Sequence, residues 1–147
     1  MYNKMLIILF LGISIQAEDS NLTENISKYV KECISNSSMD EETLADILKQ
    51  HVTPENNNEF MKVTDCFLQK SEIVTNDEFD LNKLRLLLPH MVQFSQKVDA
   101  KTAELLVKQI PEECYHIEKI EPAVAYSIKV RNCAIKHIHS AIRADEV

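Results

Sequence analysis

The chain is almost free of glycine, since Gly12 is the only one among its 147 residues. Several enzyme signatures require glycine at fixed positions, among them the Gly-x-Ser-x-Gly elbow of hydrolases and the glycine-rich loops that hold phosphates. Neither signature occurs here, and a His-Glu-x-x-His motif is missing as well. Paired acids such as Glu112-Glu113 are most simply solvated loop residues. We therefore expect the protein not to be an enzyme.

Long apolar runs are also missing, apart from one near the N-terminus. Residues 5–15 are mostly apolar, Lys4 precedes them and the small residue Ala17 follows them. This order is typical of a secretory signal peptide, whereas a membrane span takes about 20 apolar residues. We predict a signal peptide over 1–17 and a single domain over 18–147, secreted into the extracellular space.

Positive charge is scarce. The formal net charge is −7, and removal of Lys4 with the signal peptide would lower it by one. An acidic surface disfavours nucleic acid and anionic membranes as partners, so we expect neither.

The histidines form no metal-binding cluster in the sequence. His137 and His139 lie two residues apart on a predicted helix, so their side chains point to nearly opposite sides and cannot chelate one ion together. We expect His51, His90 and His116 at helix ends or in connections. The sequence thus predicts no metal site and no cofactor.

Helical periodicity runs through the chain, and no stretch alternates long enough to indicate a strand. Leu22, Ile26, Val30 and Cys33 mark one face of a first helix. We predict an all-α fold, a compact bundle of about six helices. These helices begin near residues 22, 41, 53, 81, 100 and 121, and the last one runs to about 142.

Several helix ends can be predicted from capping residues. A capping box begins at Ser38, and Thr53 is expected to cap the third helix with Pro54 at its first position. Asp80 and Asp99 can cap the fourth and fifth helices. Without glycine, we expect few left-handed turns, and helix ends that depend on asparagine, proline and polar caps.

The remaining segments are expected to be irregular. Residues 71–79 are predicted to form a connection between helices. Pro89 should end or kink the fourth helix after Leu88 and leave residues 91–94 in a looser stretch. The tail from Arg143 to Val147 is predicted to be a frayed end and not a lid.

Four cysteines remain in the predicted mature chain, and an even number in a secreted protein implies disulfides. Cys33, Cys66, Cys114 and Cys133 allow three pairings, of which pairing of sequence neighbours is the simplest. Two disulfides would stabilise a bundle with a modest core by about 2–4 kcal/mol each. Three sequons also fit secretion and are possible glycosylation sites, at Asn21, Asn25 and Asn36.

The segment Cys66-Phe67-Leu68-Gln69-Lys70, followed by Ile73, resembles the insect odorant-binding proteins (pheromone and general odorant-binding). Residues 78–84, Glu-Phe-Asp-Leu-Asn-Lys-Leu, and Arg131-Asn132-Cys133-Ala134 fit the same family. The resemblance covers nearly all of the mature chain.

Members of that family usually have six cysteines, with the second four residues before the third and the fifth nine residues before the sixth. Lys62 and Val124 hold these positions here, so both members of one disulfide are absent together. The chain therefore resembles the four-cysteine "Minus-C" type, which implies bonds Cys33–Cys66 and Cys114–Cys133. It departs from the family by a longer span between Cys66 and Cys114 and by Ser71-Glu72 where a glycine often stands.

The resemblance implies a carrier that holds an odorant, pheromone or similar lipid-like small hydrophobic ligand in an apolar cavity between the helices. It further implies that any link to a membrane chemoreceptor is indirect, and that the protein is a monomer or a weak homodimer. The alternative is a secreted helical interaction protein, such as a salivary or venom component, that acts on a protein partner. The candidate wall residues of the cavity, each of which could equally be ordinary core, are Phe60, Phe67, Leu84, Leu87, Leu88, Met91, Phe94, Leu106, Tyr126 and Val130.

Restoring the missing disulfide tests the resemblance. We expect the double variant Lys62→Cys/Val124→Cys to form a third disulfide and to raise the melting temperature, because a disulfide contributes about 2–4 kcal/mol. Thermal unfolding with and without reductant measures the gain. Two thiols that stay free under oxidising conditions would show that the alignment at position 124 is wrong.

Overall fold

The structure, a computed structural model, describes residues 21–50 and 52–145, so the predicted signal peptide and His51 lie outside the described residues. Six α-helices are present in the described part, which confirms the all-α fold. They are the N-terminal helix (21–35), α2 (Glu41–Lys49), α3 (Asn58–Lys70), α4 (Leu81–Gln96), α5 (Ala100–Lys108) and α6 (Ala123–Asp145), and a short 3-10 helix, η1 (Glu112–Tyr115), precedes α6.

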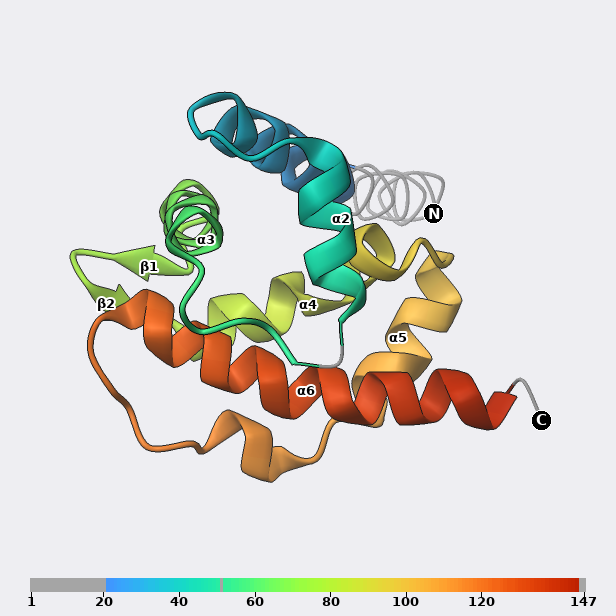
Figure 1. The fold of residues 1–147 in the computed structure, drawn as a ribbon. Helices are drawn as coiled ribbons and strands as arrows, with labels where there is room; N and C mark the ends of the chain where they lie inside the picture. The colour runs from blue at the N-terminus through green and yellow to red at the C-terminus, as the bar shows by residue number, and fades with distance from the viewer. Residues whose placement is uncertain (1–20, 51, 146–147) are drawn as a thin grey trace, which may run out of the picture.

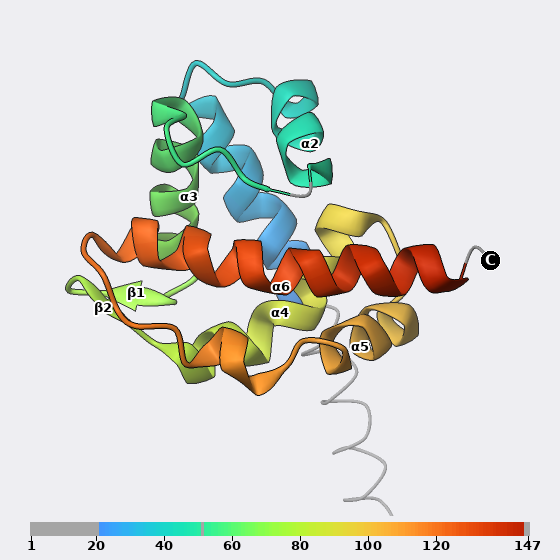
Figure 2. The same ribbon diagram turned by 60° about the horizontal axis from the view of Figure 1, so that its bottom comes forward.

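Helix α6 crosses the whole molecule (Figure 1). Figure 2 shows the N-terminal helix, α2 and α3 on one side of α6 and α5 on the other, while α4 passes behind α6 and contacts α2. The connection that contains η1 runs along the outer edge and returns the chain to the start of α6. As its apolar residues predict, α6 is therefore a central helix with neighbours on several sides.

One helix, α2, has a different N-cap from the one predicted, and another, α3, begins later than predicted. Asp40, not Ser38, is the N-cap of α2, and its carboxylate accepts a hydrogen bond of 2.7 Å from the Thr43 backbone N–H. Helix α3 begins after Asn57, whose side chain accepts from the Phe60 N–H at 3.0 Å. The prediction of Thr53 as the cap was wrong. Thr53 is fully buried, and its N–H donates to the Asn132 side chain of α6. The 52–57 segment is therefore held against α6 and does not start a helix.

Helix α4 continues through Pro89, where the sequence predicts an end or a kink followed by a looser stretch. A proline inside a helix removes a hydrogen bond and costs about 3 kcal/mol or more. Burial on both sides of the proline offsets that cost, because Leu84 and Leu87 precede it and Val92 follows it in the core. Residues 91–94 are therefore helical. The helix ends at Lys97, which adopts a left-handed conformation.

The 71–79 connection contains a minimal hairpin, which the sequence does not predict. Strands β1 (Val74–Thr75) and β2 (Glu78–Phe79) pair antiparallel, with Val74 opposite Phe79. Asn76 and Asp77 both have positive φ between them, as a type I′ turn requires, and asparagine and aspartate tolerate that conformation. Among the described residues, every position with positive φ is held by a residue other than glycine.

The C-terminal end is more ordered than the sequence predicts. Helix α6 extends to Asp145, so Arg143 and its neighbours continue the helix instead of forming a frayed end. Residues 146–147 lie outside the described part.

Both disulfides have the expected pairing. Cys33–Cys66 joins the N-terminal helix to α3, with Cα atoms 5.7 Å apart, and Cys114–Cys133 joins η1 to α6, with Cα atoms 5.5 Å apart. At the two positions where the family has further cysteines, the Lys62 side chain is 72% exposed and pairs with Glu59, while Val124 is buried. Helices α3 and α6 pack against each other without a covalent bond.

The interior divides into two apolar clusters. The first lies between the N-terminal helix, α2, α3, the first turns of α4 and the first half of α6. The second lies between the end of α4, α5, η1 and the second half of α6. No helix within residues 21–50 and 52–145 is long and apolar enough to cross a membrane. The sequon asparagines Asn21, Asn25 and Asn36 are all exposed on the surface.

The aspartate caps predict how stability depends on pH. Hydrogen bonds from the Thr43 and Thr102 N–H groups lower the pKa of Asp40 and of Asp99 from the usual 3.8. The two charged caps therefore stabilise the folded state fully at pH values above the pKa of an aspartate in the unfolded chain. This stabilisation is lost as the pH falls through the lower pKa that each aspartate has in the folded protein. We expect Asp40→Asn/Asp99→Asn, which keeps neutral caps, to show a shallower fall in melting temperature from about pH 5 to about pH 3. An unchanged slope would contradict this account.

Candidate functional site

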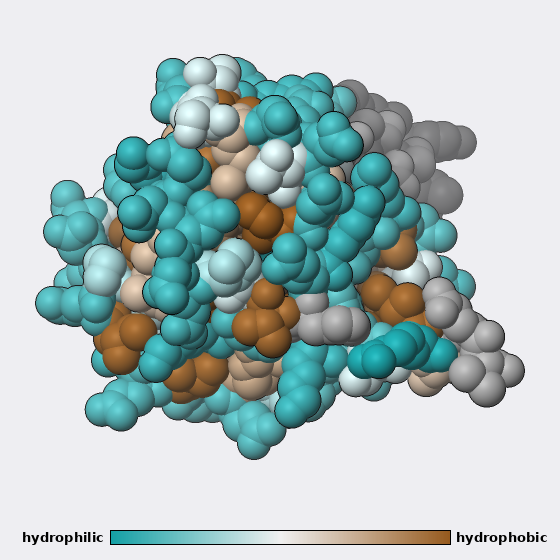
Figure 3. Space-filling model, in the orientation of Figure 1, coloured by the Kyte–Doolittle hydropathy of each residue, from teal (hydrophilic) through white to brown (hydrophobic). Residues whose placement is uncertain are grey.

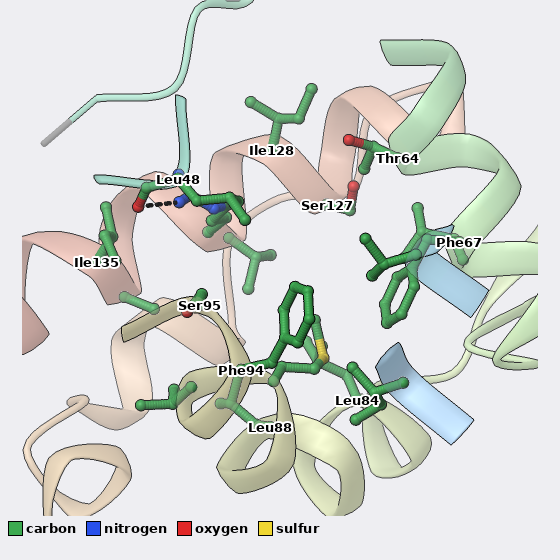
Figure 4. Close-up of a pocket in the computed structure, with 18 of the residues that line it drawn as sticks. Leu48, Thr64, Phe67, Leu84, Leu88, Phe94, Ser95, Ser127, Ile128 and Ile135 are labelled. Atoms are coloured by element: carbon green, nitrogen blue, oxygen red, sulfur yellow. Dashed lines mark hydrogen bonds between the residues drawn. The ribbon is translucent and has the colours of Figure 1, made fainter. Parts of the chain in front are cut away.

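A cavity of about 170 Å³ lies inside the bundle. Its walls come from the N-terminal helix, α2, α3, α4 and α6, together with Phe79 of β2 and Tyr115 of η1. Most of the lining side chains are aliphatic or aromatic, and Figure 4 shows them converging from α3, α4 and α6 on a common space. An apolar cavity of about 150 Å³ is large enough to stay dry and to bind a benzene-sized molecule. This cavity has room for a small hydrophobic ligand.

Helical spacing explains why α3 and α4 line the cavity. Phe60, Val63 and Phe67 lie at i, i+3 and i+7 on α3, so they form one stripe that faces inward. On α4, Leu84, Leu88 and Met91 lie at i, i+4 and i+7 and also form one stripe, and Phe94 adds an aromatic ring one turn later. Because α4 stays helical past Pro89, Met91 and Phe94 reach the same cavity as Leu84.

Seven of the ten predicted wall residues line the cavity: Phe60, Phe67, Leu84, Leu88, Met91, Phe94 and Val130. The other three are buried elsewhere. Leu87 belongs to the first apolar cluster outside the cavity wall, and Leu106 packs in the second cluster on α5. The ring of Tyr126 contacts the ring of Phe79 edge-on, with centroids 5.0 Å apart, and is not part of the wall either.

The most important residue that the sequence analysis missed is Arg131 of α6, which also lines the cavity. It lies on one stripe with Ile128, Ile135 and Ile138, at spacings of three, four and three residues, and these isoleucines are cavity residues too. A charged residue on an apolar stripe was the available signal. It was overlooked because α6 is apolar around much of its circumference.

Arg131 makes one hydrogen bond to the last turn of α2 and one to Thr53, in the segment that follows α2. One nitrogen, Nη2, donates to the Leu48 carbonyl at 3.1 Å, the bond drawn as a dashed line at Leu48 in Figure 4. The other, Nη1, donates to Thr53 Oγ1. Removal from water lowers the pKa of Arg131 to about 10. The guanidinium is therefore a cation at neutral pH in an apolar setting.

Other polar groups in the wall are hydroxyls. Ser127 already donates to the Val124 carbonyl at 2.7 Å, whereas Thr64 and Ser95 lie at separate places on the wall, as Figure 4 shows. Tyr115 is covered from outside by the Arg85 guanidinium, 4.1 Å from the ring centroid, and burial raises the pKa of its phenol. The wall therefore combines one cation with a few neutral hydroxyls.

The described residues contain one grouping with metal-ligand spacing, Cys114, Cys133 and His137, with ligand atoms within 4.8 Å of one another. Both sulfurs are in a disulfide and are not thiolates, so this grouping cannot hold zinc. His90 was expected at a helix end, but it lies inside α4, where its Nδ1 is 2.8 Å from Thr23 Oγ1. His139 is buried, and His116 lies 3.6 Å from Glu112 on the surface.

In a comparison with protein families, the model of the PBP/GOBP family matches residues 16–137. No curated protein and no solved structure matches the chain significantly. The family match spans most of the sequence and includes all four cysteines. With its two disulfides and six helices, the chain belongs to the PBP/GOBP family, the insect odorant-binding proteins, and fits their four-cysteine Minus-C type.

Proposed function

We propose that this protein is a secreted carrier that takes up a small hydrophobic molecule, an odorant, pheromone or similar lipid-like compound, in the cavity between α3, α4 and α6. The family is one of small-ligand carriers, which supports the general kind of partner. The observation that carries the proposal for this chain is the apolar cavity of about 170 Å³. Its walls are made by the residue types that hold apolar ligands in proteins.

The molecular surface supports a carrier more than a protein-binding module. Figure 3 shows hydrophobic residues on one face as separate spots between hydrophilic ones. Among the described residues, the large exposed hydrophobic side chains are Val52 in the connection after α2, Leu86 on α4 and Leu105 on α5. Single exposed hydrophobic residues are normal and do not mark an interface. The predicted signal peptide at 1–17 supports release of the carrier from the cell.

A fluorescent apolar probe tests the function directly. We expect the oxidised mature chain to take up a neutral naphthylamine-type probe and to release it when volatile or lipid-like competitors are added. Titration of probe fluorescence at neutral pH measures both steps. Absence of uptake of such probes and competitors would contradict the carrier function and favour the protein-binding alternative.

A matched pair of variants tests whether the probe occupies this cavity. Ala134 is buried in the cavity wall on α6, and Ala144 is exposed near the end of the same helix. Ala134→Leu adds three carbon atoms inside the cavity, so we expect probe affinity to fall about tenfold or more while the fold is kept. Ala144→Leu should leave the affinity unchanged. Equal effects of the two variants would place the probe elsewhere.

A further inference from the structure

Arg131 is a partly buried charged side chain on an apolar face of α6. Its neighbours on the same face of α6 are Ile128, Ile135 and Ile138, and all of them face the cavity. A charge taken out of water without an opposite charge is strongly disfavoured. Packing alone does not explain an arginine at this position, since a leucine would complete the apolar stripe.

The protein does not neutralise this charge within residues 21–50 and 52–145. No aspartate or glutamate among them forms an ion pair with Arg131, whereas exposed Lys62, Lys70 and Arg85 all have one. Removal from water alone accounts for the lowered pKa of Arg131, and no nearby anion raises it again. Arg131 thus lines the cavity without a counter-ion from the described protein.

The guanidinium also keeps hydrogen-bonding capacity. It has five N–H groups, and the described protein accepts from two, at Leu48 and Thr53. Both acceptors are neutral oxygens. The two bonds restrict how the planar group can turn, so it is positioned before a ligand arrives. A carboxylate can accept charge-assisted hydrogen bonds from the N–H groups that remain.

We propose that Arg131 is the head-group subsite of the cavity, and that the carrier takes small monocarboxylates with an apolar aryl or short alkyl part. The carboxylate would accept hydrogen bonds from Arg131, and the apolar part would lie against Val130, Phe94 and Leu84. This inference rests on the proposed carrier function and narrows its ligand class.

Size and charge favour this class over other anions. The cavity is close in volume to one that holds a benzene ring, so the apolar part is about a ring or a short chain. A phosphate would bring about two negative charges and more acceptors, while the wall offers one cation and a few hydroxyls. A single carboxylate matches the one charge that the wall supplies.

A purely structural role is the competing explanation. The Leu48 carbonyl lies in the last turn of α2, where carbonyls lack helical partners and a cation complements the helix dipole. Arg131 also contacts Thr53 and thereby holds the 52–57 segment on α6. Loss of that role would weaken every ligand alike, whereas loss of a head-group subsite would weaken acids selectively.

Three ligands with one carbon skeleton separate these cases: phenylacetate, 2-phenylethanol and 2-phenylethylamine. Their affinities are measured by displacement of the neutral apolar probe from the oxidised mature chain at pH 7. We expect wild-type protein to bind the acid at least about tenfold more tightly than the alcohol, with the amine weakest, because charge-assisted hydrogen bonds contribute about 1.5–3 kcal/mol.

Arg131→Gln removes the charge and keeps a side chain that can donate to the Leu48 carbonyl. It should abolish the preference for the acid by weakening phenylacetate binding about tenfold or more and 2-phenylethanol binding much less, and Arg131→Lys should keep part of the preference. Arg143→Gln is the matched control, since Arg143 is exposed on the same helix. Thermal unfolding of each variant verifies folding.

The outcomes are distinct. A wild-type protein that binds the probe without preferring the acid would overturn the head-group subsite and leave the carrier function standing. Equal weakening of acid and alcohol by Arg131→Gln would show that Arg131 only holds α2 and the 52–57 segment. A wild-type protein that takes up neither the probe nor any of the three ligands would overturn the carrier function as well.

Discussion

The structure depends on one constraint, that the long helix α6 has to bury apolar residues around most of its circumference. No single neighbouring helix can cover such a surface, so the N-terminal helix, α2 and α3 pack on one side, α5 packs on the other, and α4 crosses behind α6. Five shorter helices meet α6 from different directions, and their side chains leave a cavity between them. The cavity is what this arrangement leaves, and α6 supplies part of its wall along with α3 and α4.

Much of this fold could be predicted from local sequence. The spacing of apolar residues places all six helices, and Asp80 and Asp99 cap α4 and α5 as expected because a cap needs only its own helix. The errors have a common cause in distant contacts. Thr53 looks like a cap until Asn132, 79 residues later, binds its N–H. Pro89 looks like a helix end until burial on both sides of it is counted.

The residues of the cavity, too, could be predicted where local sequence decides and not where distant contacts decide. Phe60, Phe67 and Met91 could be predicted because aromatic and flexible apolar residues on a helical stripe are visible in the sequence. Leu106 could not be excluded, since only the packing of α5 shows that it belongs to the second cluster. The role proposed for Arg131 could not be recognised from the residues near it in the sequence. That role depends on finding no partner acid among the described residues, and only the fold shows that.

The two disulfides have a consequence for the chain as a whole. Each closes a separate loop, of 33 residues in the first half and 19 in the second, and all four cysteines are used. A single cut anywhere between Cys66 and Cys114 would therefore yield two fragments, each internally cross-linked and joined to the other by no covalent bond. The first fragment would carry α3 and the second α6, so the ligand cavity of the nicked protein would persist only as long as the two pieces stay associated.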